Sequence, residues 1–241
     1  MSSPVNIALI GCGSIGEAHA ECLSKIEGAN LSAFCDVIEV RSKHLCEKFG
    51  GTFFTTDPLR IFISDYIDAV YICTQTDTHE SLAIKAAHGG KHIFIEKPLA
   101  LTIKECFGIA DAIDEFHVKC MTGFKLRFYP NVLKAKEFIR LPILSIAQLM
   151  DEHWADDFWA NDPIKGGGNV LSQGVHAMDL VCYLMQSEPI RIFAEGGNFT
   201  HPSVNIFDNI ITSITFANGA MASVVIGDSG QNNLISKFSF Q

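Results

Sequence analysis

Positive charge, long apolar runs and paired cysteines are all scarce in this chain of 241 residues. Its formal net charge of −9 and its isoelectric point of 5.4 argue against nucleic acid or an anionic membrane surface as a partner. No apolar run is long enough to cross a bilayer. No Lys or Arg precedes Lys25, so the first residues do not resemble a secretory signal. These features predict a cytoplasmic protein.

The eight cysteines form no Cys-x-x-Cys pair, and several lie within apolar segments. Cysteines scattered in this way are typical of reduced core residues and indicate neither disulfides nor a zinc site. We therefore expect no metal centre. The length of the chain allows two modest domains, each with its own core.

The first chemical signal is the segment from Asn6 to Gly16, a short apolar run that ends in Gly-x-Gly-x-x-Gly. Gly11 allows a tight turn after a strand. Gly13 has no Cβ, so a pyrophosphate can approach the backbone, and Gly16 lets the following helix pack closely on the sheet. The three glycines predict a dinucleotide-binding turn.

The segments on both sides of this turn agree with that interpretation. Residues 6–10 are typical of a buried strand, and residues 15–26 carry apolar side chains at helical spacing. The first turn of the helix, at Ser14 and Ile15, would present its N–H groups and its dipole to the phosphates.

A second apolar run, from Leu31 to Cys35, ends in Asp36. A carboxylate at the end of the second strand can accept hydrogen bonds from the adenosine ribose and would repel a 2′-phosphate. The alternative is that Asp36 caps the next helix. Given the glycines, we favour the ribose role, and with it NAD over NADP.

Strands and helices alternate through the first half of the chain, which predicts a parallel, doubly wound sheet. The expected strands are 6–10, 31–35, 52–54, 69–74, 92–95 and 119–124, and the expected helices are 15–26, 39–49, 78–88 and 102–116. We place the domain boundary near Gly123, with a Rossmann domain at 1–122 and an α+β domain at 123–241.

The second half is expected to form a largely antiparallel sheet with few helices. The expected helices are 131–139 and 173–185, and the expected strands are 144–154, 190–195, 209–216 and 220–226. A turn at Asn218-Gly219 joins the last two of these strands. A further strand-like segment, Leu234 to Gln241, ends the chain.

The second chemical signal is Glu96-Lys97-Pro98, which follows the expected strand 92–95. Ligands of doubly wound sheets lie beyond the carboxyl ends of the strands, so this tripeptide should face the cofactor cleft. Lys97 could donate a hydrogen bond to a substrate hydroxyl and stabilise the developing alkoxide. The alternative is a surface lysine paired with Glu96.

The third signal is the segment GGGNVLSQGVHAMD, Gly166 to Asp179. Ser172 and His176 are four residues apart and would share one face of a helix. His176 stands near a helix start behind a glycine-rich loop, although a structural histidine is the alternative. We read the histidines of the first half as structural: His19, His44, His88 and His117.

Together these motifs resemble the glucose-fructose oxidoreductase and inositol dehydrogenase family, often written Gfo/Idh/MocA. The resemblance extends over almost the whole chain and is most specific from Thr74 to Leu101, where a strand end, a helix and Glu-Lys-Pro occur at the family's spacing. It also includes the segments GFKLRFYP, from Gly123 to Pro130, and GGG…GVH.

The resemblance implies a Rossmann domain joined to an open-faced sheet domain, and the oxidation or reduction of sugars or cyclitols with NAD(P). By the same resemblance Lys97 would touch substrate and nicotinamide, and His176 would be the general acid/base. The residues implied on the cofactor side are Thr74, Gln75, His79 and Glu96. The candidates for the substrate wall are Arg127, His153, Trp154, Trp159, Lys165, Ser172 and Gln173.

This chain departs from the family pattern at several positions. Ser172 stands where the family has an aspartate that orients the imidazole and stabilises its protonated form; a hydroxyl can only orient it. The usual Thr-Pro-Asn is Thr74-Gln75-Thr76, and the usual Asn near Arg127 is Lys125. The chain also ends early, so either the sheet is abbreviated or the chain is a fragment with an exposed edge.

The sequence therefore predicts an NAD-dependent oxidoreductase that acts on a secondary alcohol of a sugar or cyclitol. We expect a homodimer or homotetramer formed through the second sheet, because a sheet with one open face usually finds a partner. Two alternatives stay open at this point. One is a catalytically inactive nucleotide-binding sensor, and the other is an enzyme that uses transient oxidation for elimination or hydrolysis.

Overall fold

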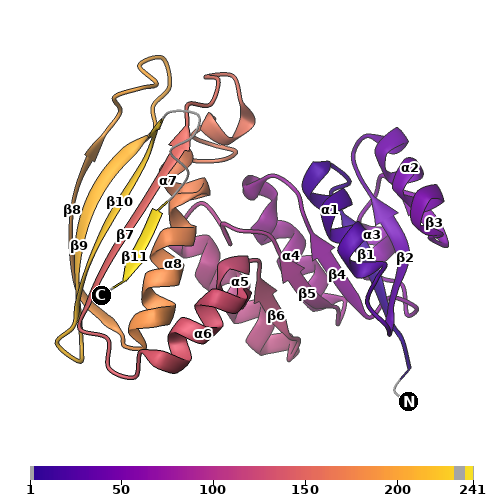
Figure 1. The fold of residues 1–241 in the computed structure, drawn as a ribbon. Helices are drawn as coiled ribbons and strands as arrows, with labels where there is room; N and C mark the ends of the chain where they lie inside the picture. Colours follow the sequence, from indigo (N-terminus) through magenta and orange to yellow (C-terminus); the bar gives the residue numbers. More distant parts are fainter. Residues whose placement is uncertain (1–2, 231–236, 241) are drawn as a thin grey trace. The chain divides into compact units, whose positions relative to one another are not determined.

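The computed structural model describes residues 3–230 and 237–240, and the chain divides into two compact units, residues 1–123 and 124–241 (Figure 1). The first unit is built on a six-stranded sheet and the second on a five-stranded sheet. Within the described ranges, no helix combines the length and the apolar composition that crossing a lipid bilayer requires.

The first unit contains a parallel sheet whose strands run in the order β3-β2-β1-β4-β5-β6. Its strands are β1 (Val5–Ile10), β2 (Ala29–Cys35), β3 (Phe53–Thr55), β4 (Ala69–Ile72), β5 (His92–Ile95) and β6 (Cys120–Thr122). Its helices are α1 (Ser14–Leu23), α2 (Glu39–Phe49), α3 (Leu59–Phe62), the 3₁₀ helix η1 (Thr76–Thr78), α4 (His79–His88) and α5 (Ile103–Phe116). This is the strand order of a dinucleotide-binding Rossmann fold. The predicted doubly wound sheet is confirmed, and the short α3 is an element that the pattern did not predict.

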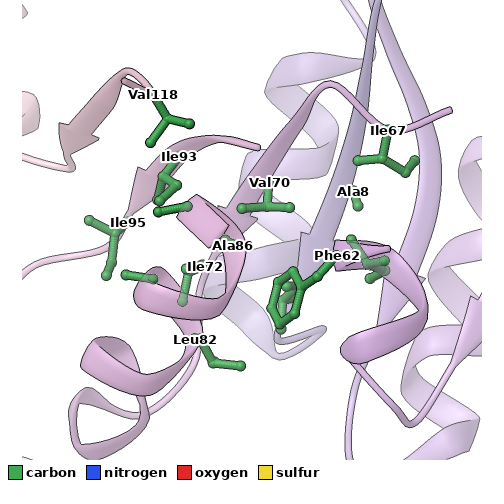
Figure 2. Close-up of a cluster of buried hydrophobic side chains, with 14 of the residues drawn as sticks. Ala8, Phe62, Ile67, Val70, Ile72, Leu82, Ala86, Ile93, Ile95 and Val118 are labelled. Carbon is green, nitrogen blue, oxygen red and sulfur yellow. The ribbon is translucent and has the colours of Figure 1, made fainter. Parts of the chain in front are cut away.

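Both faces of this sheet are buried, because successive side chains of a strand point to opposite faces. In β1, Ile7 and Leu9 join the core beneath α1 and α2. Ala8 and Ile10 join the opposite core, in which side chains of α3, α4 and α5 pack. Figure 2 shows the second of these cores, with Val70 and Ile72 of β4 beside Ile93 and Ile95 of β5 and Leu82 of α4.

The strand order reverses between β1 and β4, which pair in parallel at the centre of the sheet. The chain leaves β1 toward one side and β4 toward the other, so the loops after these strands separate and leave a crevice at the carboxyl edge. Gly11 follows β1, and Thr74 follows β4 after Cys73. The fold therefore brings the glycine turn and the loop after β4 to the same edge of the sheet.

The second unit is built on a mixed sheet in the order β11-β7-β10-β9-β8. Its strands are β7 (Leu144–Glu152), β8 (Pro189–Gly197), β9 (Asn209–Phe216), β10 (Met221–Gly230) and β11 (Lys237–Phe240). Its helices are the 3₁₀ helices η2 (Lys125–Phe128) and η3 (Trp159–Asn161), together with α6 (Pro130–Phe138), α7 (Asn169–Ser172) and α8 (Gly174–Met185). The pairs β8–β9, β9–β10 and β7–β11 are antiparallel, and β7–β10 is parallel. The predicted largely antiparallel sheet is confirmed. Of the strand-like end of the chain, residues 234–236 and 241 lie outside the described residues.

One face of the second sheet is covered and the other is open. Val181 of α8 packs with Ala147 of β7 and Val224 of β10 in a closed apolar core. The neighbouring strand residues that point the other way, among them Ile146 and Ile211, are exposed. The second unit therefore has the open apolar sheet face that the sequence predicts.

The cysteines differ in burial, and this difference can be tested by their reactivity. Burial, followed by the charge of Asp36, raises the pKa of both Cys12 and Cys35 to about 12. Cys22, in contrast, is exposed on α1, so the expectation of core positions does not hold for it. Because the thiolate is the reactive form, we expect the exposed thiol of Cys22 to react rapidly in the native protein, and the buried thiols of Cys12 and Cys35 to react only after unfolding. A chromogenic disulfide reagent measures this, and Cys22→Ser should remove the rapid phase; a rapid phase that persists in this variant would contradict the assignment.

Candidate active site

The glycine turn between β1 and α1 has the geometry that the motif predicts. Gly11 has a φ of +94°, and a Cβ there would lie 2.5 Å from the carbonyl oxygen of Cys73. A Cβ on Gly16 would lie 2.0 Å from the carbonyl oxygen of Gly11. A Cβ on Gly13 would meet nothing within 4 Å. The first and third glycines are thus required for packing, and the second faces open space through which a phosphate can approach.

Helix α1 begins directly at this turn. Its N-cap is Gly13, so no side-chain acceptor satisfies the N–H groups of the first turn. These N–H groups, those of Ser14 and Ile15 included, are suited to bind an anion, with the positive end of the helix dipole behind them. The turn therefore fits the pyrophosphate of a dinucleotide.

Asp36 lies at the base of the same turn, one residue after β2. Its Oδ2 accepts a hydrogen bond of 2.7 Å from the N–H of Cys12, and its Oδ1 accepts one of 2.8 Å from the N–H of Ile38. The carboxylate is 7% exposed. Ile38 is the N-cap of α2, so the alternative helix-cap role of Asp36 does not apply. Each carboxylate oxygen keeps a second lone pair, so this group can still accept hydrogen bonds from a ribose diol.

The loop after β4 contains the predicted residues Thr74, Gln75 and His79. The hydroxyls of Thr74 and Thr78 lie 2.7 Å apart, and Gln75 is exposed. His79 is 1% exposed, and its Nδ1 and Nε2 lie 3.0 Å from the carbonyl oxygen of Pro98 and 3.2 Å from that of Thr74. Contrary to expectation, this ring has no exposed surface to offer a ribose; it holds the loops after β4 and β5 together.

The loop after β5 contains a contact that the sequence did not predict. His19 of α1 donates a hydrogen bond of 2.7 Å from Nε2 to Oε1 of Glu96. Burial alone would raise the pKa of Glu96, but the hydrogen bond and charge of His19, followed by the N–H of Lys97, lower it below its usual value. Glu96 is therefore an anion bound to His19, with its charge also stabilised by that of Lys97. A histidine one turn after Gly16, on a helix that starts at the carboxyl edge of the sheet, is the signal that could have identified this pair.

Lys97 itself is half-buried, and it directly follows Glu96 at the end of β5. Oε2 of Glu96 accepts a hydrogen bond of 3.0 Å from the backbone N–H of Lys97. The carboxylate of Glu96 thus fixes the backbone at Lys97 and also binds His19. This arrangement positions an ammonium group at the carboxyl edge of the Rossmann sheet, where ligands of this fold bind.

In the second unit, Arg127 of η2 is bound by Asp179 of α8. Its Nε lies 2.8 Å from Oδ2 of Asp179, and its Nη2 also donates to this carboxylate. The guanidinium lies over the rings of Phe124 and Tyr183, with 5.3 Å to the centroid of the latter. In the sequence, Asp179 is only the last residue of the glycine-rich segment. The structure shows that it is the ion-pair partner of Arg127.

Ser172 and His176 are both 6% exposed, but a single helix does not carry them. Ser172 is the last residue of α7, and His176 lies in the first turn of α8. Gln173 joins the two helices and keeps right-handed helical dihedrals, with φ −109° and ψ −36°. The ring of His176 meets Phe124 edge-on, with centroids 6.4 Å apart. His176 lies near a helix start, as predicted, and α8 begins one residue after the start predicted for the helix 173–185.

The remaining substrate-wall candidates lie after β7, which ends two residues earlier than predicted. Trp154 and Trp159 both pack against Phe158, with centroids 5.3 and 5.8 Å from it. Lys165 is exposed and lies 3.8 Å from Asp162. The tryptophans thus form one aromatic cluster, and Lys165 stands apart from it in a surface ion pair.

His153 belongs to a different cluster. Its ring is stacked on that of His201 with centroids 4.4 Å apart. His201, in the loop between β8 and β9, was not among the predicted site residues. The tertiary structure is what brings these two histidines together.

Residues 5–124 match the family model of an oxidoreductase family with an NAD-binding Rossmann fold, and residues 143–233 match the GFO/IDH/MocA C-terminal domain. The chain therefore belongs to the Gfo/Idh/MocA oxidoreductase family, and the family resemblance is confirmed. The Rossmann unit provides an NAD(P)-binding fold.

Named relatives are similar over most of this chain. It is 30% identical over 227 residues to a myo-inositol 2-dehydrogenase of Thermotoga maritima, a match that covers 91% of this chain and 67% of that protein. It is 30% identical over 233 residues to a scyllo-inositol 2-dehydrogenase (NAD(+)) of Bacillus subtilis, with 93% and 67% covered.

Among solved structures, GenD2 from gentamicin A biosynthesis in complex with NAD has a TM-score of 0.88 at 22% identity, with 97% of this chain and 68% of that chain covered. The myo-inositol 2-dehydrogenase of Lactobacillus plantarum has a TM-score of 0.83 at 22% identity, with 99% and 75% covered. At this level of identity the two structures confirm the fold.

Proposed function

We propose that this protein is an NAD-dependent dehydrogenase that acts on a secondary alcohol of a cyclitol or sugar. The observation that carries the choice of NAD is the buried carboxylate of Asp36, held against the glycine turn by the N–H of Cys12. A fixed anion at this point favours a ribose diol and repels a 2′-phosphate. The names of the relatives support the substrate class, because two of them are inositol 2-dehydrogenases.

In this proposal the first-turn N–H groups of α1 bind the pyrophosphate, and Asp36 binds the ribose. NAD, when bound, would supply the hydride acceptor for this oxidation. His176 takes the proton of the substrate hydroxyl, and Lys97 donates a hydrogen bond to the oxygen and stabilises its negative charge. Glu96, itself held by His19, positions Lys97 through the backbone N–H.

The test is a screen of cyclitols, aldoses and sugar acids with NAD and with NADP, followed by the absorbance of reduced nicotinamide. Turnover with a cyclitol or sugar supports the proposal. Tight NADH binding without turnover on any of these compounds would favour the second candidate, a nucleotide-binding sensor. Ser172, in place of the family's carboxylate, is the observation that favours that candidate.

We also infer that the open apolar face of the second sheet binds another copy of the chain. Exposed side chains of neighbouring strands, Ile146, Ile211 and Met221, form its centre. We further infer a reducing compartment, the cytoplasm, since all eight cysteines are unpaired.

The cofactor preference is tested by Asp36→Ser combined with Val37→Arg, the latter at a position that is 89% exposed. We expect the ratio of NAD to NADP affinity to fall by on the order of tenfold to a hundredfold, the scale of hydrogen bonds to one charged group. Val37→Arg alone is the matched control, and thermal unfolding checks that both variants fold. Equal affinity of the unmodified protein for NAD and NADP would contradict the role of Asp36.

A further inference from the structure

The second unit contains a cluster of ligand-type side chains to which the proposed reaction assigns no proton or hydride transfer. His153, Asp156 and His201 each offer one nitrogen or oxygen atom, and these atoms all lie within 4.8 Å of one another. We propose that this cluster binds a divalent transition-metal ion of the zinc type, with two histidines and one carboxylate as ligands. This inference is independent of the proposed dehydrogenase activity.

The topology of the sheet explains why residues so distant in sequence meet here. β7 and β10 are parallel, and Glu152 pairs with Gly230 near their carboxyl ends. Asn209, at the start of β9, pairs with both Gly227 of β10 and Gly197 of β8. The segment after β7, the loop between β8 and β9, and the end of β10 therefore meet at one edge of the sheet.

His201 is the buried anchor of the cluster. The side chain of His201 is 0% exposed, and so is that of Asp228 in β10. Nε2 of His201 donates a hydrogen bond to the carboxylate of Asp228. Its Nδ1 lies 2.6 Å from Oδ1 of Asp156. A histidine that ligates a metal through one nitrogen almost always donates its other N–H to a carboxylate or carbonyl. Asp228 holds the His201 ring in this way, with Nδ1 directed toward Asp156 and the ring of His153 stacked on its face.

A second buried carboxylate fixes the loop that carries His201. Asp208 accepts hydrogen bonds from the backbone N–H groups of Phe199, Thr200 and His201, at 2.6 to 3.1 Å. The hydroxyl of Thr200 lies 2.7 Å from Oδ1 of Asp228. Asp228 thus fixes the ring of His201, and Asp208 fixes the backbone of its loop. A metal site needs supporting contacts of this kind, because they orient the ligand before the metal binds.

The other two ligands lie on the solvent side and can adjust. His153 and Asp156 are both exposed, so small side-chain rotations can bring their ligand atoms to the distance of about 2.0–2.2 Å that zinc takes to imidazole and carboxylate. In the structure the N–H of His201 Nδ1 donates to Asp156, and the metal ion would take the place of that proton. Three protein ligands leave the fourth tetrahedral position to water.

The test is a titration of the chelator-treated full chain with Co²⁺, whose visible d–d bands report the ligand set, and with Zn²⁺ in competition. We expect about one equivalent to bind without thiolate charge-transfer bands, and to raise the unfolding temperature. His153→Gln and Asp156→Asn should each weaken binding by at least about tenfold to a hundredfold, because the loss of a supporting contact alone already has this effect. Both positions are exposed, so both variants should fold.

Matched controls are available close by. Asp157→Asn makes the same charge change at the neighbouring exposed residue, and His44→Gln removes an exposed histidine of the first unit. Neither should change the affinity. The proposal is overturned if the wild type binds less than one equivalent, if thiolate bands appear, or if Asp156→Asn and Asp157→Asn bind the ion equally well.

Discussion

Replacement of Lys97 by methionine is expected to lower turnover by on the order of a hundredfold to a thousandfold, the scale of losing one donor to a developing oxyanion. Methionine keeps much of the side-chain volume and removes the ammonium group. Binding of NADH should stay within a few fold, because the pyrophosphate and ribose contacts are assigned to the turn from Gly11 to Gly16 and to Asp36. Single-turnover hydride transfer and quenching of protein fluorescence by NADH measure the two effects separately.

Lys104→Met is the matched control for this prediction, since Lys104 is exposed on α5. It should leave both turnover and NADH binding unchanged. Normal turnover of Lys97→Met would mean that Lys97 is not catalytic. A parallel loss of NADH binding would mean that the lysine acts mainly on the cofactor.

Removal of the His176 imidazole is expected to slow the chemical step by on the order of a hundredfold or more, the usual effect of losing a general base. His44→Ala, at an exposed position on α2, is the control and should have no effect. His176 is 6% exposed, so thermal unfolding must show that the variant is folded before its rate is interpreted. Near-normal hydride transfer in folded His176→Ala would place the base elsewhere.

Ser172→Asp restores the carboxylate that the family has at this position. We expect activity to be kept or raised, and the acid limb of the pH–rate profile to move to higher pH, since a nearby anion favours the protonated imidazole. Because Ser172 belongs to α7 and His176 to α8, this substitution also tests whether the two side chains face each other. An unmoved acid limb would show that the side chains at 172 and 176 face apart. An inactive but folded variant would show that Ser172 has a role that an aspartate cannot take.

The sequence by itself determined the order of the strands and of the longer helices along the first unit, and the position of the glycine turn between β1 and α1. Both depend on neighbouring residues: the side-chain period shows which faces of β1 are buried, and the spacing of Gly11, Gly13 and Gly16 defines a strand–turn–helix unit. The position of Asp36 at the carboxyl end of β2 could be predicted for the same reason, because it directly follows a strand with a clear apolar pattern. Boundaries were less accurate, as at Trp154, since the last residues of a strand depend on its partners.

Only the tertiary structure decided which distant side chains meet. The pairs His19 with Glu96, Arg127 with Asp179, and His153 with His201 each join residues that are far apart in the chain. It also showed that His79 is enclosed between two loops. Such contacts follow from the order and register of strands in a sheet, which depend on long-range packing that no local pattern encodes. The longer helices and the glycine turn can therefore be predicted from the sequence, whereas the side-chain pairs between distant segments cannot.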